Sequence, residues 1–204
     1  MNWQTTASAI LENEHVMLRP VREDDRESVR ALARDSHIWR YFVFRVSNEE
    51  EFETFFNAML SDQATGTRAV FIVVDKASGQ IAGSMSFGNM VEKEARLEIG
   101  WSWLGEAFRG KGINRWAKYL LMRHAFEVLG ALRVEFKTDV LNLQARSGLR
   151  NIGAKEEGVL RSFNFMPDNR RRDAVFYSVL ADEWPQVSDT LLHRAKAGPR
   201  PEAQ

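Results

Sequence analysis

Hydrophobic and polar residues follow one another along the chain in patterns that predict a series of strands. Residues His15–Pro20 alternate apolar and polar side chains, which is typical of a strand with one buried face. The run Ala69–Asp75 is almost continuously apolar, which favours a strand buried on both faces. The segments Ile81–Met90 and Ala95–Leu104 follow after turn residues, and we expect them to form a three-stranded meander with the apolar run.

Two helices are expected between the first strand and the meander. Residues Glu23–Asp35 have the composition of a helix with acidic residues in its first turn. Ser47 is a good N-cap and Glu50 stands three residues later, which predicts a capping box. The helix that follows should place four apolar side chains on one face: Phe52, Phe55, Phe56 and Met59.

The second half of the chain alternates helices and strands. An apolar stripe predicts a helix from Gly112 to Leu129, with Gly130 at its C-cap. We expect a strand over Leu132–Thr138, and then a short helix over Asn142–Ile152. The final elements are expected to form a hairpin of Gly158–Phe165 and Arg172–Leu180, followed by a tail from residue 182 that begins with a helix. The order of elements, without repeats or breaks in composition, predicts one mixed α/β domain.

The composition excludes several classes of function. The 204 residues include 28 basic and 28 acidic side chains, so the chain lacks the basic excess of a non-specific nucleic-acid binder. The sequence has no cysteine, which excludes disulfides, cysteine-ligated metals and a cysteine nucleophile. Its four histidines are scattered without ligand spacing, so we expect no metal site. No apolar segment is long enough to span a membrane and no signal peptide is recognisable, which predicts a cytoplasmic protein.

The segment after the third meander strand has the chemistry of a phosphate-binding loop. Glycines at 105, 110 and 112 allow tight turns that bring backbone N–H groups to one side. The helix behind them offers its N-terminal donors and the positive end of its dipole. Arg109 and Lys111 add positive charge, so we expect a pyrophosphate cradle here.

A nucleotide-triphosphatase loop is the competing interpretation of this segment. Residues 105–111 satisfy G-x-x-x-x-G-K, but the next residue is Gly112 and not the serine or threonine that would hold magnesium. Such a loop also normally follows an early parallel strand. Both observations disfavour the triphosphatase hypothesis.

The loop and its surroundings resemble the GNAT superfamily of acetyl-coenzyme-A-dependent N-acetyltransferases. Arg109–Asn114 (RGKGIN) is similar to the motif Q/R-x-x-G-x-G/A, with Asn114 at the position of the last glycine or alanine. Leu97–Leu104 resembles the fourth strand of the family, and Arg133–Asp139 and Gly158–Arg161 resemble its later half. The similarity is greatest to the branch of the ribosomal-protein-alanine acetyltransferases.

The resemblance implies a fold, a domain and a reaction. The fold would be a mixed, mostly antiparallel sheet of about seven strands, splayed between strands four and five and flanked by about four helices. The domain would span residues 14–184, after a lead-in of residues 1–13 and before a tail of residues 185–204. The activity would be transfer of an acetyl group from acetyl-CoA to a primary amine, either a protein N-terminus or a small molecule. A homodimer is compatible with the family, and a non-catalytic acyl-CoA-binding domain is the alternative function.

The same resemblance assigns the site residues. Glu98 is the candidate general base, because acidic residues recur at this position in the family and Gly100 leaves room on the same strand face. Asn142 is the second catalytic candidate, and it also suits an N-cap. A serine and a general-acid tyrosine of many relatives are replaced by Ala145 and Leu149. The residues expected to bind the cofactor are Ser102, Trp103, Leu104, Arg109, Gly110, Lys111, Gly112, Ile113, Asn114 and Asn142.

Overall fold

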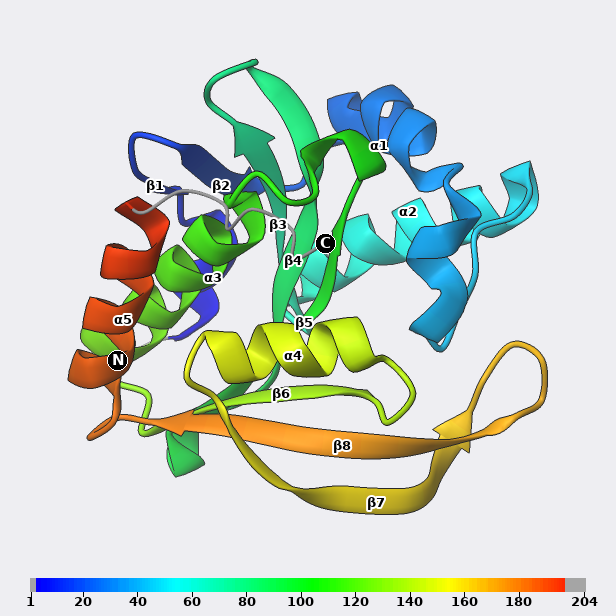
Figure 1. The fold of residues 1–204 in the computed structure, drawn as a ribbon. Coiled ribbons are helices and arrows are strands. Elements are labelled where there is room, and N and C mark those ends of the chain that lie inside the picture. The colour runs from blue at the N-terminus through cyan, green and yellow to red at the C-terminus, as the bar shows by residue number, and fades with distance from the viewer. Residues whose placement is uncertain (1–2, 197–204) are drawn as a thin grey trace, which may run out of the picture.

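A computed structural model describes residues 3–196 of the chain. Within this range one eight-stranded sheet carries five α-helices, three on one face and two on the other (Figure 1). The strands are β1 (Leu11–Glu12), β2 (Val16–Pro20), β3 (Ala69–Asp75), β4 (Gln80–Val91), β5 (Arg96–Leu104), β6 (Arg133–Asp139), β7 (Lys155–Phe165) and β8 (Arg171–Leu180). The helices are α1 (Arg26–Ala33), α2 (Glu49–Thr65), α3 (Ile113–Arg123), α4 (Leu143–Asn151) and α5 (Trp184–Lys196).

The sheet has the strand order β1-β2-β3-β4-β5-β6-β8-β7. Its pairs are antiparallel except for β5 and β6, which run parallel. These two strands pair only over Arg96–Glu98 and Arg133–Glu135, although both continue beyond that point. The sheet therefore opens between β5 and β6, as the predicted splay requires. Because the strands are parallel, the segments that follow them leave the sheet at the same edge.

Two hydrophobic cores lie on opposite faces of the sheet. One core packs β2 to β6 and β8 against α3, α4 and α5, and the other packs β3 and β5 against α1 and α2. Strand β3 contributes to both, because Phe71 and Val73 enter the first core whereas Val70, Ile72 and Val74 enter the second. Burial on both faces explains the uninterrupted apolar run of this strand.

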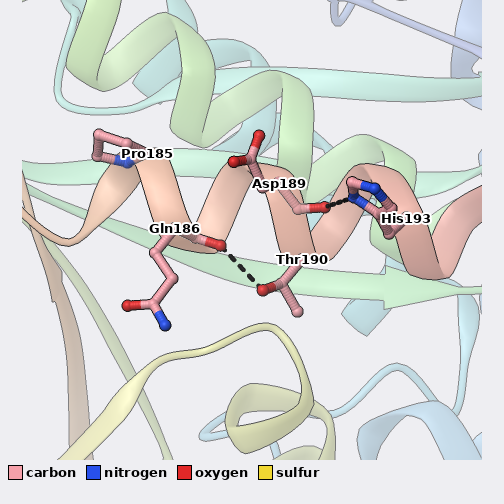
Figure 2. Close-up of a pocket in the computed structure, with 5 residues that line it drawn as sticks. All are labelled: Pro185, Gln186, Asp189, Thr190 and His193. Atoms are coloured by element: carbon pink, nitrogen blue, oxygen red, sulfur yellow. Dashed lines mark hydrogen bonds between the residues drawn. The ribbon is translucent and has the colours of Figure 1, made fainter.

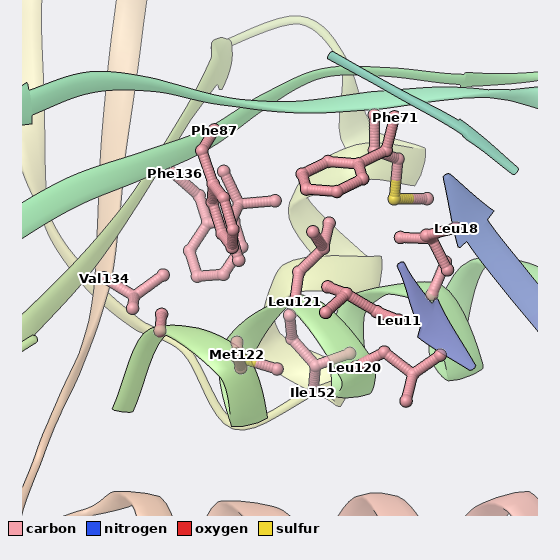
Figure 3. Close-up of a cluster of buried hydrophobic side chains, with 14 of the residues drawn as sticks. Leu11, Leu18, Phe71, Phe87, Leu120, Leu121, Met122, Val134, Phe136 and Ile152 are labelled. Carbon is pink, nitrogen blue, oxygen red and sulfur yellow. The ribbon is translucent and has the colours of Figure 1, made fainter. Parts of the chain in front are cut away.

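The core under α3 is built from aromatic side chains of the sheet and aliphatic side chains of the helix. Figure 3 shows Phe71 and Phe87 reaching from their strands toward Leu120 and Leu121 of α3. The two phenyl rings meet edge to face with centroids 5.7 Å apart, a favourable aromatic geometry. This packing fixes α3 against the sheet and so fixes the loop that precedes it.

Both ends of the described chain pack more closely than the sequence indicated. Trp3 and Leu11 are buried in the first core, and β1 adds an eighth strand to the seven expected. The folded body therefore begins before residue 14. At the other end, the helix expected at the start of the tail is confirmed as α5, which brings the number of α-helices to five instead of four. Trp184 and Leu191 of α5 are buried against α3. The remainder of the tail, residues 197–204, lies outside the described residues.

The start of α2 differs by one residue from the predicted capping box. Asn48 is the N-cap, and its side chain accepts a hydrogen bond from the Glu51 amide at 2.8 Å. Glu51 in turn accepts from the Ser47 amide at 2.8 Å. The prediction that Ser47 and Glu50 form the box was wrong, because Asn48 is an equally good cap one residue later. The shift leaves Glu50 outside the capping network.

Candidate active site

The phosphate-binding loop has the conformation that its glycines were expected to provide. Gly110 and Gly112 have φ values of 74° and 81°, in the left-handed region that disfavours other residues. A Cβ at either glycine would meet no atom within 4 Å, so backbone conformation and not crowding requires glycine. Gly112 is the N-cap of α3, and as a glycine it has no side chain to cap the helix. The backbone N–H groups at this helix end, beginning at Ile113, suit the binding of an anion.

The charged side chains of the loop have different partners. Arg109 donates from Nε to the Leu104 carbonyl at 3.0 Å and from Nη2 to Asp35 at 2.9 Å. Its guanidinium thus holds the loop against the segment after α1. Lys111 is exposed, with Nζ 5.9 Å from the centroid of the Phe108 ring. Of these two cations, Lys111 is the one with no hydrogen bond or ion pair in the described structure.

A third cation, Lys118, stands beside the first turn of α3 and was missed by the sequence analysis. Its Nζ donates to Oδ1 of Asn114 at 2.8 Å, four residues earlier on the helix. Burial lowers the pKa of Lys118 from 10.5 to about 8. The i, i+4 spacing from Asn114 is the signal that could have identified it.

Strand β5 is interrupted by a bulge that reverses its alternation of faces. Between Gly100 and Trp103, β5 has one more residue than the paired segment of β4, and Trp101 adopts a φ of 50°. Leu97 and Ile99 therefore enter the core under α3, whereas Trp103 enters the core under α2. A regular strand would place Leu97, Ile99, Trp101 and Trp103 on one face, and the bulge prevents this.

The bulge directs Trp101 over the backbone of β4. A Cβ on Gly88 would lie 2.3 Å from a ring carbon of Trp101, so only glycine allows the indole to lie there. The guanidinium of Arg68 lies over the ring at 4.8 Å from its centroid. Trp101 is thereby held between β4 and Arg68.

Beyond Glu98, the edge of β5 that faces β6 has no strand partner. On its other edge, Trp103 and Leu104 remain paired with Ser84 and Gly83 of β4. Backbone groups of residues 99–104 that face the splay are thus available to a ligand, which suits the role expected of Ser102, Trp103 and Leu104. Two carbonyls of residues 99–104 already accept side-chain hydrogen bonds, that of Leu104 from Arg109 and that of Gly100 from the Ser102 hydroxyl.

Glu98 lies at the apex of the splay and is buried, with 5% of its surface exposed. Its Oε2 accepts hydrogen bonds from Lys137 Nζ at 2.8 Å and from Asn89 Nδ2 at 2.6 Å. A Cβ on Gly100 would come within 2.9 Å of Oε1, so the space left by this glycine accommodates the glutamate itself. The glutamate is ion-paired with Lys137, and the sequence did not indicate this partner. Arg96 and Arg133, the nearby arginines of the same two strands, instead pair with Glu135.

More charge surrounds Glu98 on the neighbouring strands. Asp139 is fully buried and pairs with Arg170. Arg172 is 6% exposed, and its Nε has no hydrogen-bond partner in the described structure. Burial lowers the pKa of Arg172, while the negative charges of Asp139 and Glu98 oppose that effect. The apex of the splay is thus a buried polar site in a largely apolar sheet.

Asn142 lies at the end of β6, across the splay from the cradle that follows β5. Its Oδ1 accepts a hydrogen bond from the Ala145 amide at 3.0 Å, which confirms it as the N-cap of α4. The parallel course of β5 and β6 therefore places the cradle and Asn142 at one edge of the sheet, with Glu98 at the apex between them.

A cavity of about 700 Å³ lies on the α2 side of the sheet and reaches the hydrogen-bond partner of Glu98. Asn89, which bonds Glu98, is part of its wall. One face of α2 lines it together with Trp101 and the turn between β7 and β8. Its lining residues are Val43, Phe44, Arg45, Glu50, Glu51, Thr54, Phe55, Ala58, Asp62, Thr67, Arg68, Asn89, Trp101 and Pro167.

A second hollow lies on the outer surface of α5 and lacks converging polar groups (Figure 2). All its lining residues belong to this one helix. Thr190 donates to the Gln186 carbonyl at 2.9 Å, and His193 Nδ1 lies 2.8 Å from the Asp189 carbonyl. Both side chains thus bond to the backbone of their own helix. This hollow contains none of the groups described above.

Comparison with known proteins identifies the family. Residues 15–155 match the acetyltransferase (GNAT) domain, which is more than half of the chain. The chain belongs to the GNAT acetyltransferase family. The chain is therefore an N-acetyltransferase by family, and the family uses acetyl-CoA as acetyl donor. The expected class of fold, with its splayed and mostly antiparallel sheet, is confirmed.

Individual relatives agree with this assignment. The uncharacterized N-acetyltransferase YnaD of Bacillus subtilis (strain 168) is 23% identical over 169 residues, which cover 83% of this chain and 95% of that protein. A crystal structure of an inferred acetyltransferase from T. thermophilus is 34% identical with a TM-score of 0.82, covering 91% and 96% of the two chains. RimJ of Mycobacterium smegmatis in complex with CoA-disulfide shares the fold at 22% identity and a TM-score of 0.75, with 88% of each chain covered.

The described range has neither a membrane-spanning helix nor a cluster of metal ligands. Residues 3–196 contain no helix with the length and apolar character needed to cross a bilayer. In the same range no three histidine, aspartate or glutamate side chains are grouped as metal ligands would be.

Proposed function

We propose that this chain transfers the acetyl group of acetyl-CoA directly to a primary amine, with Glu98 as the general base. The observation that carries the proposal is the alignment of three features along the splay. The uncapped N-terminus of α3 lies at the end of one strand, Asn142 lies at the end of the other, and Glu98 lies at the apex between them.

The cradle fits a pyrophosphate by its geometry. The left-handed glycines 110 and 112 turn the backbone into the first turn of α3, and Lys111 and Lys118 add positive charge. We assign cofactor binding to residues 109–114, with the Arg109 side chain holding the loop in place through Asp35. The unpaired edge of β5 would hold the pantetheine arm through backbone groups of residues 102–104, and Asn142 would contact the cofactor near the thioester.

Glu98 would take the proton that the amine must lose. The amine nitrogen forms a bond to the thioester carbonyl carbon, the carbon–sulfur bond breaks, and coenzyme A leaves as a thiolate that is protonated from water. Direct transfer is favoured, since the chain has no cysteine that could carry the acetyl group. Lys137 and Asn89 hold the Glu98 carboxylate in one orientation. Proton transfer requires a base that is fixed within hydrogen-bond reach of the proton.

The acceptor is either a protein N-terminus or a small-molecule amine. The RimJ fold relative and the resemblance to ribosomal-protein acetyltransferases support the first. The cavity that reaches Asn89, the partner of Glu98, supports the second. We assign the catalytic domain to residues 14–184. The N-terminal segment and α5 pack against this domain and complete its first core. A cytoplasmic location and a homodimer remain predictions from the sequence.

The proposal is tested in two steps with the full chain. Calorimetry with acetyl-CoA should give saturable binding, and release of free thiol should then accelerate when amines from a broad panel are added. A protein that binds no acetyl-CoA would overturn the proposal. Binding without acetylation of any amine or peptide would favour the alternative of a non-catalytic acyl-CoA-binding domain.

A further inference from the structure

The cavity beside Glu98 has one end at the reaction site and the other at the start of α2. Asn89 connects the first end to Glu98 through the 2.6 Å hydrogen bond. Glu50 and Glu51 lie at the other end, in the first turn of α2. A volume of about 700 Å³ lies within the range of small-molecule sites and exceeds what a single short amine would fill.

The wall formed by α2 follows from the helical repeat. Glu51, Phe55, Ala58 and Asp62 recur at intervals of three and four, so they share one face, and that face lines the cavity. Phe52, Phe56 and Met59 face the core instead. Phe55 serves both faces: it packs against this core through Trp39 and Trp103, and its ring stacks on Phe44 at the cavity wall, with centroids 5.4 Å apart.

Most of the charge on this wall is already paired. Glu51 accepts hydrogen bonds from the Ser47 hydroxyl and from Arg45, which lower its pKa from 4.5 to about 2. Asp62 pairs with Arg68 at 2.6 Å. Glu50 is the remaining carboxylate of the lining, and it has no ion pair or hydrogen bond in the described structure. The lining therefore carries one carboxylate without a matching cation.

The rest of the wall is suited to an apolar and cationic ligand. The rings of Phe44, Phe55 and Trp101 present aromatic surface, and aromatic faces attract cations. Arg68 already lies over Trp101 in this way. An apolar chain would pack on the rings, and a positive charge at its far end would meet Glu50.

We propose that this cavity binds the non-reacting part of the acceptor, and that the acceptor is a dicationic amine. One amine is presented to Glu98 for acetylation, an apolar body lies along Phe44 and Phe55, and a second cationic group pairs with Glu50. This inference rests on the proposed function, because it specifies the acceptor of the same site.

The test compares two acceptors that differ in one charge, 1,6-diaminohexane and n-hexylamine. We expect kcat/KM for the diamine to exceed that for the monoamine by about fivefold, the upper range for a solvent-facing ion pair. Glu50→Gln should abolish this preference. Glu49→Gln is the matched control, because Glu49 is the neighbouring residue of the same turn but pairs with Arg30 and is absent from the cavity wall. The preference should also shrink as salt rises, which a structural effect would not predict.

The outcomes separate this inference from the proposed function. Acetylation of both amines with equal kcat/KM, or a preference that survives Glu50→Gln, would overturn the inference and leave the acetyltransferase intact. Saturation-transfer NMR with the diamine measures binding without turnover. Binding that depends on Glu50, with no acetylation of any amine, would support a dicationic-amine site in the cavity but contradict the proposed function and, with it, the role of the amine as acceptor.

Discussion

The ammonium of Lys137 lies 2.8 Å from the carboxylate of Glu98, across the point where β5 and β6 part. The last residue pair between the two strands is Glu98 with Glu135, and Lys137 lies two residues farther along β6. The ion pair thus joins the two arms of the splay at their apex. It fixes the Glu98 side chain at the last residue pair that β5 and β6 share.

Replacing Glu98 with glutamine should lower turnover and leave cofactor binding unchanged. The amide is nearly isosteric but cannot take a proton, so we expect kcat to fall by about 10²–10⁴-fold if Glu98 is the base. Glu135→Gln is the control, because Glu135 is the paired residue on β6 but bonds Arg96 and Arg133. Thiol release gives kcat, and calorimetry gives the dissociation constant for acetyl-CoA. Equal activity of the two variants would exclude Glu98 as the base.

Replacing Lys137 with methionine should destabilise the protein by about 1–3 kcal/mol. Loss of one partner from a buried ion pair leaves an uncompensated charge, and Lys137 is less buried than Glu98, so we expect less than the full penalty of a buried pair. Urea unfolding measures this change. In the double variant with Glu98→Gln the loss should be smaller than the sum of the two single losses. Additive losses would show that the ion pair contributes nothing.

The sequence predicted the elements better than it predicted the site. Periodicity identified β3, α2 and α3, because each buries a continuous face or stripe. The bulge at Trp101 could not be predicted, since one extra residue in a strand leaves no mark in an apolar pattern. Glycines 110 and 112 were recognisable because their chemistry is local. Lys137 was missed as the partner of Glu98, because that contact depends on the register of two strands that are distant in sequence.

Replacing Gly112 with alanine should weaken cofactor binding and cost about 1–2 kcal/mol of stability. The penalty arises because a Cβ disfavours a φ of 81°, although no atom blocks the space. Gly148→Ala is the control, since Gly148 lies inside α4 without a positive φ and with open space around it. That change should stabilise the protein by about 0.5–1 kcal/mol. Calorimetry with acetyl-CoA and thermal unfolding provide both measurements.

Lys118 should make stability depend on pH in the alkaline range. Its pKa is lowered by burial in the folded state, to about 8 from 10.5, so the unfolded chain binds more protons between these two values. Stability should therefore rise with pH over this window, as the half-buried Lys118 side chain loses the charge that opposes its desolvation. We expect Lys118→Met to stabilise the protein by about 1–2 kcal/mol at pH 7 and to flatten this rise. Urea unfolding at pH 7 and pH 9.5 would test this, and an unchanged slope in the variant would contradict it.

Replacing Gly88 with alanine should affect the acceptor and not the cofactor. The new methyl group would lie 2.3 Å from the ring of Trp101, so the indole must move into the cavity or β4 must shift. Either movement narrows the cavity. Trp101 lines it directly, and a shift of β4 would also move Asn89, the next residue of the strand, which bonds Glu98. We expect KM for the amine to rise about tenfold, equivalent to about 1.4 kcal/mol, with the acetyl-CoA affinity retained. Steady-state kinetics with each substrate varied in turn would distinguish this from a general loss of folding, which would lower both affinities together.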